Sequence, residues 1–275
     1  MAKNRFRFGS NWKQFIKSLD EERIMEAERS LIEWTGIDDF SGLSFLDIGS
    51  GSGLFSLAAR RLGATVHSFD YDVDSVECTS YLKKRFFKGD PDWTVEQGDV
   101  LDEEYLSKYE EHDIVYSWGV LHHTGNMYKA LENTGHKVKN GGRLFIAIYN
   151  DQGLQSEFWK KEKKLFNQLP YVLKLFVSIA YFIILWTVKI IVDFVRVKPF
   201  DHWKRYKKER GMSRWHDTVD WVGGYPFEVA KPEEIFSFYK NRGFVLEKMS
   251  TLGVGHGCNQ YVFRKCNIPD NTEGQ

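Results

Sequence analysis

Between residues 43 and 149 the chain alternates short apolar runs with helical patterns, and this alternation constrains the fold more than any other feature. Parallel strands need crossover connections, which are usually helices, so this alternation is typical of a parallel sheet with helices on its faces. The five runs with strand character are 43–49, 65–70, 93–99, 112–119 and 142–149. Two further strands, 244–252 and 259–266, follow a helix that ends at Gly243. The sequence therefore predicts an α/β fold with a doubly wound, mostly parallel seven-stranded sheet.

The composition excludes several classes of protein. Of the 275 residues, 42% are hydrophobic and 16% aromatic, which is too rich for a disordered chain. The 38 basic and 38 acidic residues cancel, so no global positive field would attract nucleic acid. Cys78, Cys258 and Cys266 lack metal-ligand spacing and are odd in number, which favours a reducing compartment and no metal site. The N-terminal residues lack an apolar signal core, and we expect a cytoplasmic location.

The patterns divide the chain into five expected segments. Residues 12–35 predict an amphipathic helix that is broken once. Residues 151–230 interrupt the strand and helix alternation after the fifth strand, so they are interpreted as an insertion. The segments are an N-terminal helical lid (1–40), a nucleotide-binding core (41–150), a helical and loop insertion that caps the substrate (151–230), the closing helix and strands (231–266), and a tail (267–275).

A glycine loop follows the first strand in the order Asp47-Ile48-Gly49-Ser50-Gly51-Ser52-Gly53. Glycines let the backbone approach a ligand, and the helix that follows offers free N–H groups, so the loop indicates a nucleotide site. The dinucleotide fingerprint needs a glycine three residues after Gly51, where this chain has Leu54, so NAD is disfavoured. The phosphate-binding GxxxxGK[ST] loop is also missing, which disfavours ATP hydrolysis.

The DxGxGxG loop, with acidic residues ending the second and third strands, resembles the class I S-adenosylmethionine-dependent methyltransferases. The resemblance covers residues 43–149 and the closing strands and implies their Rossmann-like fold. It implies S-adenosyl-L-methionine as cofactor and S-adenosyl-L-homocysteine as product, with no obligatory metal. Asp70 would accept hydrogen bonds from the ribose hydroxyls and Asp99 from the adenine amino group. The implied cofactor residues are Asp47, Gly49, Gly51, Gly53, Asp70, Tyr71, Asp99, Val100 and Ser117.

The N-terminal segment 5–12 is rich in arginine, aromatic residues and glycine. In related enzymes such a segment folds over the cofactor, where an arginine can meet its carboxylate and an aromatic ring can cover it. We interpret the segment as a lid, with Trp12 against the cofactor. An ordinary basic tail is the alternative.

His122 and His123 lie within Val120-Leu121-His122-His123-Thr124, after the fourth strand. A catalytic pair is conceivable, because bases assist some methyl transfers. In the resembled family a histidine at this point commonly packs at the start of the fourth helix, and we favour that interpretation. The segment also resembles, over a short stretch, enzymes that modify the wobble uridine of tRNA.

Residues 175–188 form an uncharged run within the insertion, and basic segments lie on both sides. Polar residues recur at near-helical steps and form one stripe: Lys174, Ser178, Tyr181, Lys189, Asp193 and Arg196. A full membrane crossing needs about 20 apolar residues, and basic residues at both ends argue against spanning. We expect a helix over 170–198 whose apolar face is covered by a membrane surface, a second copy of the chain, or the protein's own core.

Residues 211–230 lack a clean period and are predicted to form a loop. This connection overlies the carboxyl ends of the strands, where ligands bind in such folds. His216 is the first candidate base, with Asp217 or Glu228 to orient it, and Tyr225 would shape an aromatic pocket. The alternative is a capping turn. His256 is a second candidate, for which a hairpin turn is the stronger interpretation. The patterns FGxNW, HDxxDWxGGxPFE and GHGCNQ resemble a bacterial group of methyltransferases.

The favoured function is methyl transfer to a small, hydrophobic, lipid-like or quinone-like acceptor, by an enzyme that is cytoplasmic or peripheral at the cytoplasmic membrane face. One alternative is an RNA methyltransferase of the tRNA wobble-uridine type. It would use a phosphate-binding patch formed by Lys204, Arg205, Lys207, Lys208 and Arg210. The zero net charge counts against nucleic acid. The other alternative is a noncatalytic protein that binds S-adenosylmethionine as a scaffold.

Overall fold

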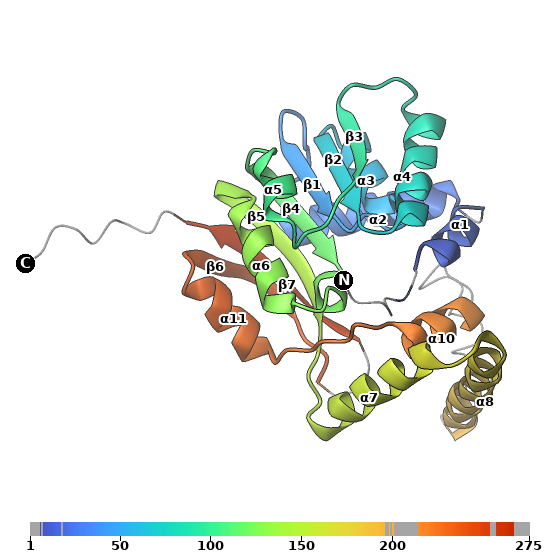
Figure 1. Ribbon diagram of the computed structural model, residues 1–275. Coiled ribbons are helices and arrows are strands. Elements are labelled where there is room, and N and C mark those ends of the chain that lie inside the picture. The colour runs from blue at the N-terminus through green and yellow to red at the C-terminus, as the bar shows by residue number, and fades with distance from the viewer. Residues whose placement is uncertain are drawn as a thin grey trace, which may run out of the picture.

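The computed structural model describes residues 6, 8–17, 19–195, 198, 200, 214–253 and 257–266. Its centre is a seven-stranded sheet in the order β3-β2-β1-β4-β5-β7-β6 (Figure 1). β1 to β5 pair in parallel, and β7 is antiparallel to both β5 and β6. The predicted α/β class and mostly parallel sheet are confirmed. The strands are β1 (Ser44–Ile48), β2 (Thr65–Asp70), β3 (Trp93–Gln97), β4 (His112–Trp118), β5 (Val138–Tyr149), β6 (Phe244–Ser250) and β7 (Cys258–Lys265).

The helices cover both faces of the sheet and form a separate group beyond its carboxyl edge. Asp20 separates the first two helices, and its side chain accepts a hydrogen bond from the Arg23 N–H as the N-cap of the second helix. The predicted single break within residues 12–35 is therefore confirmed. The helices are α1 (Gly9–Lys17), α2 (Glu21–Thr35), α3 (Leu54–Arg61), α4 (Val73–Phe86), α5 (Glu103–Ser107), η1 (Leu121–His123), α6 (Met127–His136), α7 (Leu154–Gln168), α8 (Tyr171–Val195), α10 (Arg214–Gly223) and α11 (Pro232–Lys240).

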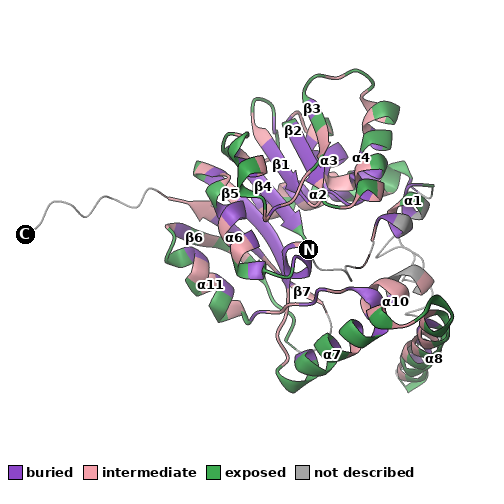
Figure 2. Cartoon of the chain, viewed as in Figure 1, coloured by how far each residue is buried: buried purple, intermediate pink, exposed green. Residues whose placement is uncertain are grey.

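Two apolar layers sandwich the sheet, because successive strand residues point to opposite faces. Phe45 of β1 belongs to the layer under α2, α3 and α4, whereas its neighbour Leu46 belongs to the layer under α6 and α11. Figure 2 shows the sheet as the most deeply buried part of the chain. Leu31 of α2 is fully buried in the first layer. α2, which lies within the expected lid segment 1–40, is therefore part of the core.

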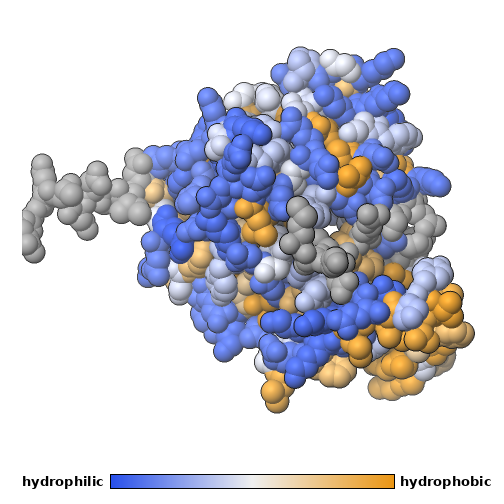
Figure 3. Space-filling view, viewed as in Figure 1, coloured by the Kyte–Doolittle hydropathy of each residue, from blue (hydrophilic) through white to orange (hydrophobic). Residues whose placement is uncertain are grey.

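Within its described residues the insertion after β5 contains α7, α8 and α10, which lie together beyond the sheet (Figure 1). The prediction of a loop over 211–230 is wrong for residues 214–223, which are helical. Trp215, Thr218 and Val222 follow helical spacing and turn inward, but the His and Asp residues between them and the glycines that follow obscured the period. The space-filling view shows an apolar surface over α8 (Figure 3).

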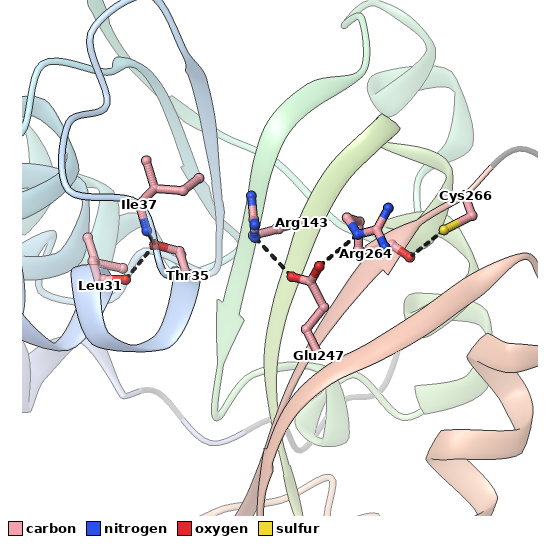
Figure 4. A network of polar contacts seen from close by, with 7 residues as sticks. All are labelled: Leu31, Thr35, Ile37, Arg143, Glu247, Arg264 and Cys266. Atoms are coloured by element: carbon pink, nitrogen blue, oxygen red, sulfur yellow. Dashed lines mark hydrogen bonds and ion pairs between the residues drawn. The ribbon is translucent and has the colours of Figure 1, made fainter.

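The antiparallel edge of the sheet carries a compact polar network (Figure 4). Arg143 of β5 and Arg264 of β7 are paired across the two strands, where like charges repel. Glu247 of β6 accepts a hydrogen bond from each, at 3.0 and 2.7 Å. This carboxylate offsets the repulsion and helps to fix the register of the last two strands. At the end of α2 in the same view, Thr35 donates to the Leu31 carbonyl at 2.7 Å.

We expect Leu31→Ala to lower the free energy of unfolding by about 2–5 kcal/mol, because it leaves a cavity in a packed core. Met25→Ala on the same helix is the matched control, since Met25 is 44% exposed. That control should change the free energy by no more than about 0.5 kcal/mol. Urea titration followed by circular dichroism measures both. An equally small effect for Leu31→Ala would mean that α2 is a detachable part of the lid.

Candidate active site

The glycine loop is tied to the end of the neighbouring strand. Asp70, the last residue of β2, accepts a hydrogen bond from the Gly51 N–H at 2.9 Å with one carboxylate oxygen. The other oxygen accepts from the Asp72 N–H at 2.8 Å. Gly51 has a φ of +55°, which a residue with a Cβ rarely adopts. The carboxylate and the loop are therefore held side by side at the carboxyl edge of the sheet.

The end of β3 places a second carboxylate along the same edge. β2 and β3 pair in register at Asp70 and Gln97, so Asp99 lies just beyond the paired ends. Asp99 accepts a hydrogen bond from the Leu101 N–H at 2.9 Å. The amide of Asn133 in α6 donates to the carbonyl of the buried Val100 at 2.8 Å, which fixes this turn. Tyr71, directly after Asp70, is 43% exposed at the rim.

Asp47 and Ser117 lie beneath the loop and contact protein groups. Asp47 is buried and accepts a hydrogen bond from the Ser56 hydroxyl at 2.5 Å. Burial raises the pKa of Asp47 to about 7, against the opposing effect of that hydrogen bond. The Ser117 hydroxyl donates to the Ile48 carbonyl at 2.9 Å. Both side chains anchor the strands that carry the loop.

α1 packs directly over the glycine loop. A Cβ on Gly51 would lie 3.1 Å from the indole nitrogen of Trp12, so this ring covers the loop backbone. The Gly9 N–H donates to the Asp72 carboxylate at 3.0 Å, and Lys13 pairs with Asp74 at 2.6 Å. These contacts hold α1 to the start of α4. Arg5 and Arg7 of the expected lid lie outside the described residues.

The same segment also reaches the insertion. Asn11 donates to Asp220 of α10 at 2.5 Å, and the Phe6 N–H donates to the Tyr225 carbonyl at 2.9 Å. Phe6 packs so closely on Gly223 that a Cβ there would overlap its ring. Residues 6–17 therefore bridge the glycine loop and the insertion helices.

An aromatic cluster fills the space between the end of β5 and the insertion. The Tyr149 ring centroid lies 4.0 Å from that of His122, 5.3 Å from Phe227 and 5.7 Å from Trp221. A small pocket opens here, and its walls come from β5, α7, α10 and three connections. It is lined by Tyr149, Asn150, Gln152, Gln155, Ser156, Trp159, Trp221, Phe227 and Gly257.

Lys163 of α7 is fully buried behind three aromatic walls of this pocket. Its Nζ lies 4.3 Å from the Trp221 ring centroid, 5.0 Å from Phe227 and 5.7 Å from Trp159. Within the described part of the chain this nitrogen has no hydrogen-bond partner. Burial lowers the pKa of Lys163 to about 7.

The sequence reasoning missed Lys163, because it treated the lysines of segment 158–164 only as a basic flank. A signal was available. Trp159, Lys163 and Phe166 share one helical face, and a lysine within an apolar face is unusual enough to mark a site.

The predicted catalytic residues take different places. His216 and Asp217 belong to α10, and their side chains lie outside the described part of the structure, as does His256. Tyr225 is half-buried next to Pro226. The Glu228 carboxylate accepts from the Met127 N–H at 3.1 Å, at the start of α6, and burial raises its pKa. Glu228 thus caps a helix in this structure.

His122 and His123 are buried in η1, just before α6, as a packing role requires. One ring nitrogen of His123 is 2.6 Å from the Pro226 carbonyl oxygen. Burial lowers the pKa of His122 well below its usual value, so the ring is neutral at physiological pH. Among the described residues, no group of three His, Cys, Asp or Glu side chains could hold a metal ion.

The edge formed by β1, β2 and β3 suits a nucleoside-like group. Two carboxylates at adjacent strand ends can accept from a sugar diol and an amino group, and the backbone of the loop can approach closely. Trp12 supplies an apolar cover on one side. The aromatic pocket at the end of β5 lies further along the same edge, where a second ligand could meet the first.

Comparisons with known proteins agree with this arrangement. Residues 19–182 match the family described as methyltransferase domain. The ubiquinone biosynthesis O-methyltransferase of Brucella anthropi is 32% identical over 111 residues, which are 40% of this chain and 43% of that protein. The corresponding enzyme of Chelativorans sp. is 30% identical over 111 residues, which are 40% and 42%. This chain therefore spans less than half the length of these curated relatives.

A solved structure shows the same fold across almost the whole chain. Magnesium protoporphyrin IX methyltransferase from Synechocystis PCC 6803, with bound SAH, superposes with a TM-score of 0.54. The match covers 93% of each chain at 14% sequence identity.

Asp47 generates a pH-dependent stability that can be measured. Its folded pKa of about 7 lies above the ordinary 3.8, so the folded protein keeps a proton that the unfolded chain releases. The free energy of unfolding should therefore fall as pH rises from about 4 to 7, by up to ~4 kcal/mol. Asp47→Asn should remove this fall and exceed the natural protein in stability at pH 8. Urea titrations at several pH values measure the effect.

Asp113→Asn is a control of opposite sign. Partial burial would raise the pKa of Asp113, but hydrogen bonds from Lys139 and Ser44 outweigh that effect and lower it. Its contribution is present at neutral pH and disappears as pH falls through the folded pKa. This variant should lose stability at neutral pH. If both variants lost stability at neutral pH, Asp47 would be ionised in the folded protein.

Proposed function

We propose that this chain, which belongs to the methyltransferase-domain family, transfers a methyl group from S-adenosyl-L-methionine to a small hydrophobic acceptor and releases S-adenosyl-L-homocysteine. The observation that carries the proposal is the glycine loop bonded to Asp70 and covered by Trp12. Family membership rests on the match over 19–182. The relatives named as ubiquinone biosynthesis O-methyltransferases support a quinone-like acceptor and methylation at oxygen.

In this proposal the strand ends bind the cofactor. Asp70 accepts from the ribose hydroxyls, Asp99 accepts from the adenine amino group, and Gly49, Gly51 and Gly53 line the loop around the remainder. Tyr71 and Val100 flank the nucleoside, and Trp12 excludes water from it. Asp47 and Ser117 act as positioning residues, because they hold the loop from below. The cofactor supplies an electrophilic methyl group on a positively charged sulfur.

The acceptor occupies the aromatic pocket at the end of β5 in this proposal. Its hydroxyl oxygen forms the new bond to the methyl carbon while the carbon–sulfur bond breaks, and the hydroxyl proton passes to a base. His216 remains our candidate base, with Asp217 to orient it, and Tyr225 and Glu228 shape the surroundings. The ammonium of Lys163 lies behind Trp159, Trp221 and Phe227 and would attract an anionic oxygen of the acceptor.

Each expected segment has a role in this scheme. Residues 6–17 act as the lid, residues 41–150 and 231–266 form the catalytic core together with α2, and residues 151–230 cap the acceptor. The two alternatives are less well supported. The basic patch 204–210 of the RNA hypothesis lies outside the described residues, and the net charge is zero. A noncatalytic scaffold would not need the aromatic pocket at the end of β5.

Asp70→Ala should weaken S-adenosyl-L-homocysteine binding by about 1.5–3 kcal/mol, roughly 10- to 150-fold, because a charge-assisted hydrogen bond is lost. Isothermal calorimetry measures this. Asp92→Ala is the control, since Asp92 is an exposed carboxylate at the opposite end of the sheet. Equal affinities for all three proteins would exclude Asp70 from the site, and NADH binding in place of S-adenosyl-L-homocysteine would overturn the proposed function.

The acceptor class is tested with isotopically labelled S-adenosyl-L-methionine in cell extracts that are then separated into lipid, RNA and protein fractions. We expect label in the lipid or small hydrophobic fraction, and much less label with Asp70→Ala. Label in RNA would establish the alternative. Binding of the cofactor without label in any fraction would support the scaffold hypothesis.

Lys163→Met should lower methyl transfer to the identified acceptor by about 10- to 100-fold without changing affinity for S-adenosyl-L-homocysteine. Methionine fills a similar volume, and the buried amine has no hydrogen-bond partner among the described residues, so its removal should not lower the melting temperature. Lys160→Met, at an exposed position of the same helix, is the control. Unchanged turnover in Lys163→Met would show that the ammonium does not act on the acceptor.

A further inference from the structure

α8 presents its apolar side outward, whereas a surface helix of a soluble protein presents its polar side outward. Its polar residues Ser178 and Asp193 are buried, at 3% and 1% exposure, and Tyr181 is half-buried. Large apolar side chains point outward instead and are 39–78% exposed (Figure 3). We call this surface the outer face of α8: Leu175, Phe176, Ile179, Ile183, Ile184, Val188, Ile191, Phe194 and Val195.

The polar side of α8 is fixed to the other insertion helices. The hydroxyl of Tyr181 bonds the Glu162 carboxylate of α7, and its ring lies 5.8 Å from Trp159. Phe182 lies 5.7 Å from Trp215 of α10. These contacts hold the helix along the body of the protein, and no described part of the chain covers the outer face. Within the expected span 170–198 the structure describes a helix over Tyr171–Val195, and the described core of the protein does not cover its apolar side.

The outer face is too wide for one partner helix. At about 100° per residue, the exposed positions of α8 extend over roughly 200° of its circumference. A seam between two packed helices is narrower, whereas acyl chains can cover any exposed apolar area. The neighbouring helix α7 also carries exposed apolar residues. In α7, Leu154, Phe158 and Leu165 are 91%, 59% and 61% exposed.

Charge around this surface favours an anionic lipid headgroup. Lys160, Lys161 and Lys164 are exposed on α7, and Lys198 is exposed just after α8. The sequence 204–210 contains five further basic residues. The acidic residue of α8, Asp193, is buried. Basic residues beside an apolar face are typical of helices that lie at an anionic membrane surface.

We propose that α8 lies in the plane of an anionic lipid bilayer, with its outer face among the acyl chains and the lysines of α7 at the headgroups. α8 is long and apolar enough to cross a bilayer by length and composition. The contacts of Tyr181 and Phe182 with the protein body, together with basic residues at both ends, oppose a crossing. Trp159 contacts α8 and also lines the aromatic pocket, so a hydrophobic ligand in the bilayer would lie close to that pocket.

The test is co-sedimentation of the full chain with vesicles of phosphatidylcholine and with vesicles that also contain phosphatidylglycerol. We expect binding to the mixed vesicles, weaker binding to phosphatidylcholine alone, and a loss of binding at high salt. Ile183→Glu and Ile184→Glu should each weaken binding by about tenfold or more, because a charge replaces an apolar side chain in the acyl layer. Both positions are more than half exposed, so folding should be preserved.

Val245→Glu is the matched control, since Val245 of β6 is 49% exposed on the far side of the sheet. It should bind vesicles as the natural protein does. Cofactor affinity of all variants, measured by calorimetry, reports folding and separates this result from the proposed function. Vesicle binding can be absent while cofactor binding is present, and cofactor binding can be absent while vesicle binding is present.

Three results would overturn the proposal. The first is a protein that binds neither kind of vesicle and has the mass of a dimer in light scattering, while the Ile183→Glu variant has the mass of a monomer. The outer face would then bind a second copy of the chain. The second is a monomer that ignores vesicles. The third is retention in the membrane fraction after alkaline carbonate extraction, which would indicate a helix that spans the bilayer.

Discussion

The hydrogen bond from the Gly51 N–H to the Asp70 carboxylate is the contact on which the candidate site depends. It joins the turn after β1 to the end of β2, and both lie at the carboxyl edge because parallel strands end together. The buried Asp47, bonded to Ser56, supports the same turn from below. Because burial raises the pKa of Asp47, this residue lowers the free energy of unfolding at neutral pH. The support that it gives to the glycine loop therefore reduces the stability of the folded protein.

α1 couples the two halves of the site. Trp12 packs on the glycine loop, while Asn11 of the same helix bonds Asp220 of α10. A ligand that displaced or ordered this helix would act on both the nucleoside edge and the aromatic pocket. α1 is also anchored by Phe15 and Ile16, which are buried in the apolar layer under α2, α3 and α4. Entry of the cofactor and closure over the acceptor can thus be one event in the proposed reaction.

The insertion joins the aromatic pocket to the outer face of α8. Trp159 lines the pocket on one side of α7 and contacts Tyr181 of α8 on the other. The polar side of α8 contacts the protein, and its apolar side therefore faces outward. The proposed hydrophobic acceptor, the buried Lys163 and the proposed membrane contact of α8 are consistent with one another, because such an acceptor would not need to cross water.

The sequence by itself determined the sheet, the glycine loop and the acidic residues at the strand ends. The periodicity of strands and helices and the position of Gly51 can be recognised within short segments of the sequence. Burial of one face of each element gives the periodicity its clear apolar pattern. Only the tertiary structure revealed that Lys163 lies among three aromatic rings, since Trp159 comes from its own helix but Trp221 and Phe227 come from residues far along the chain. It also decided which side of α8 faces outward. Periodicity finds a polar stripe such as Ser178 and Asp193, but only packing against α7 and α10 determines whether that stripe meets water or the protein.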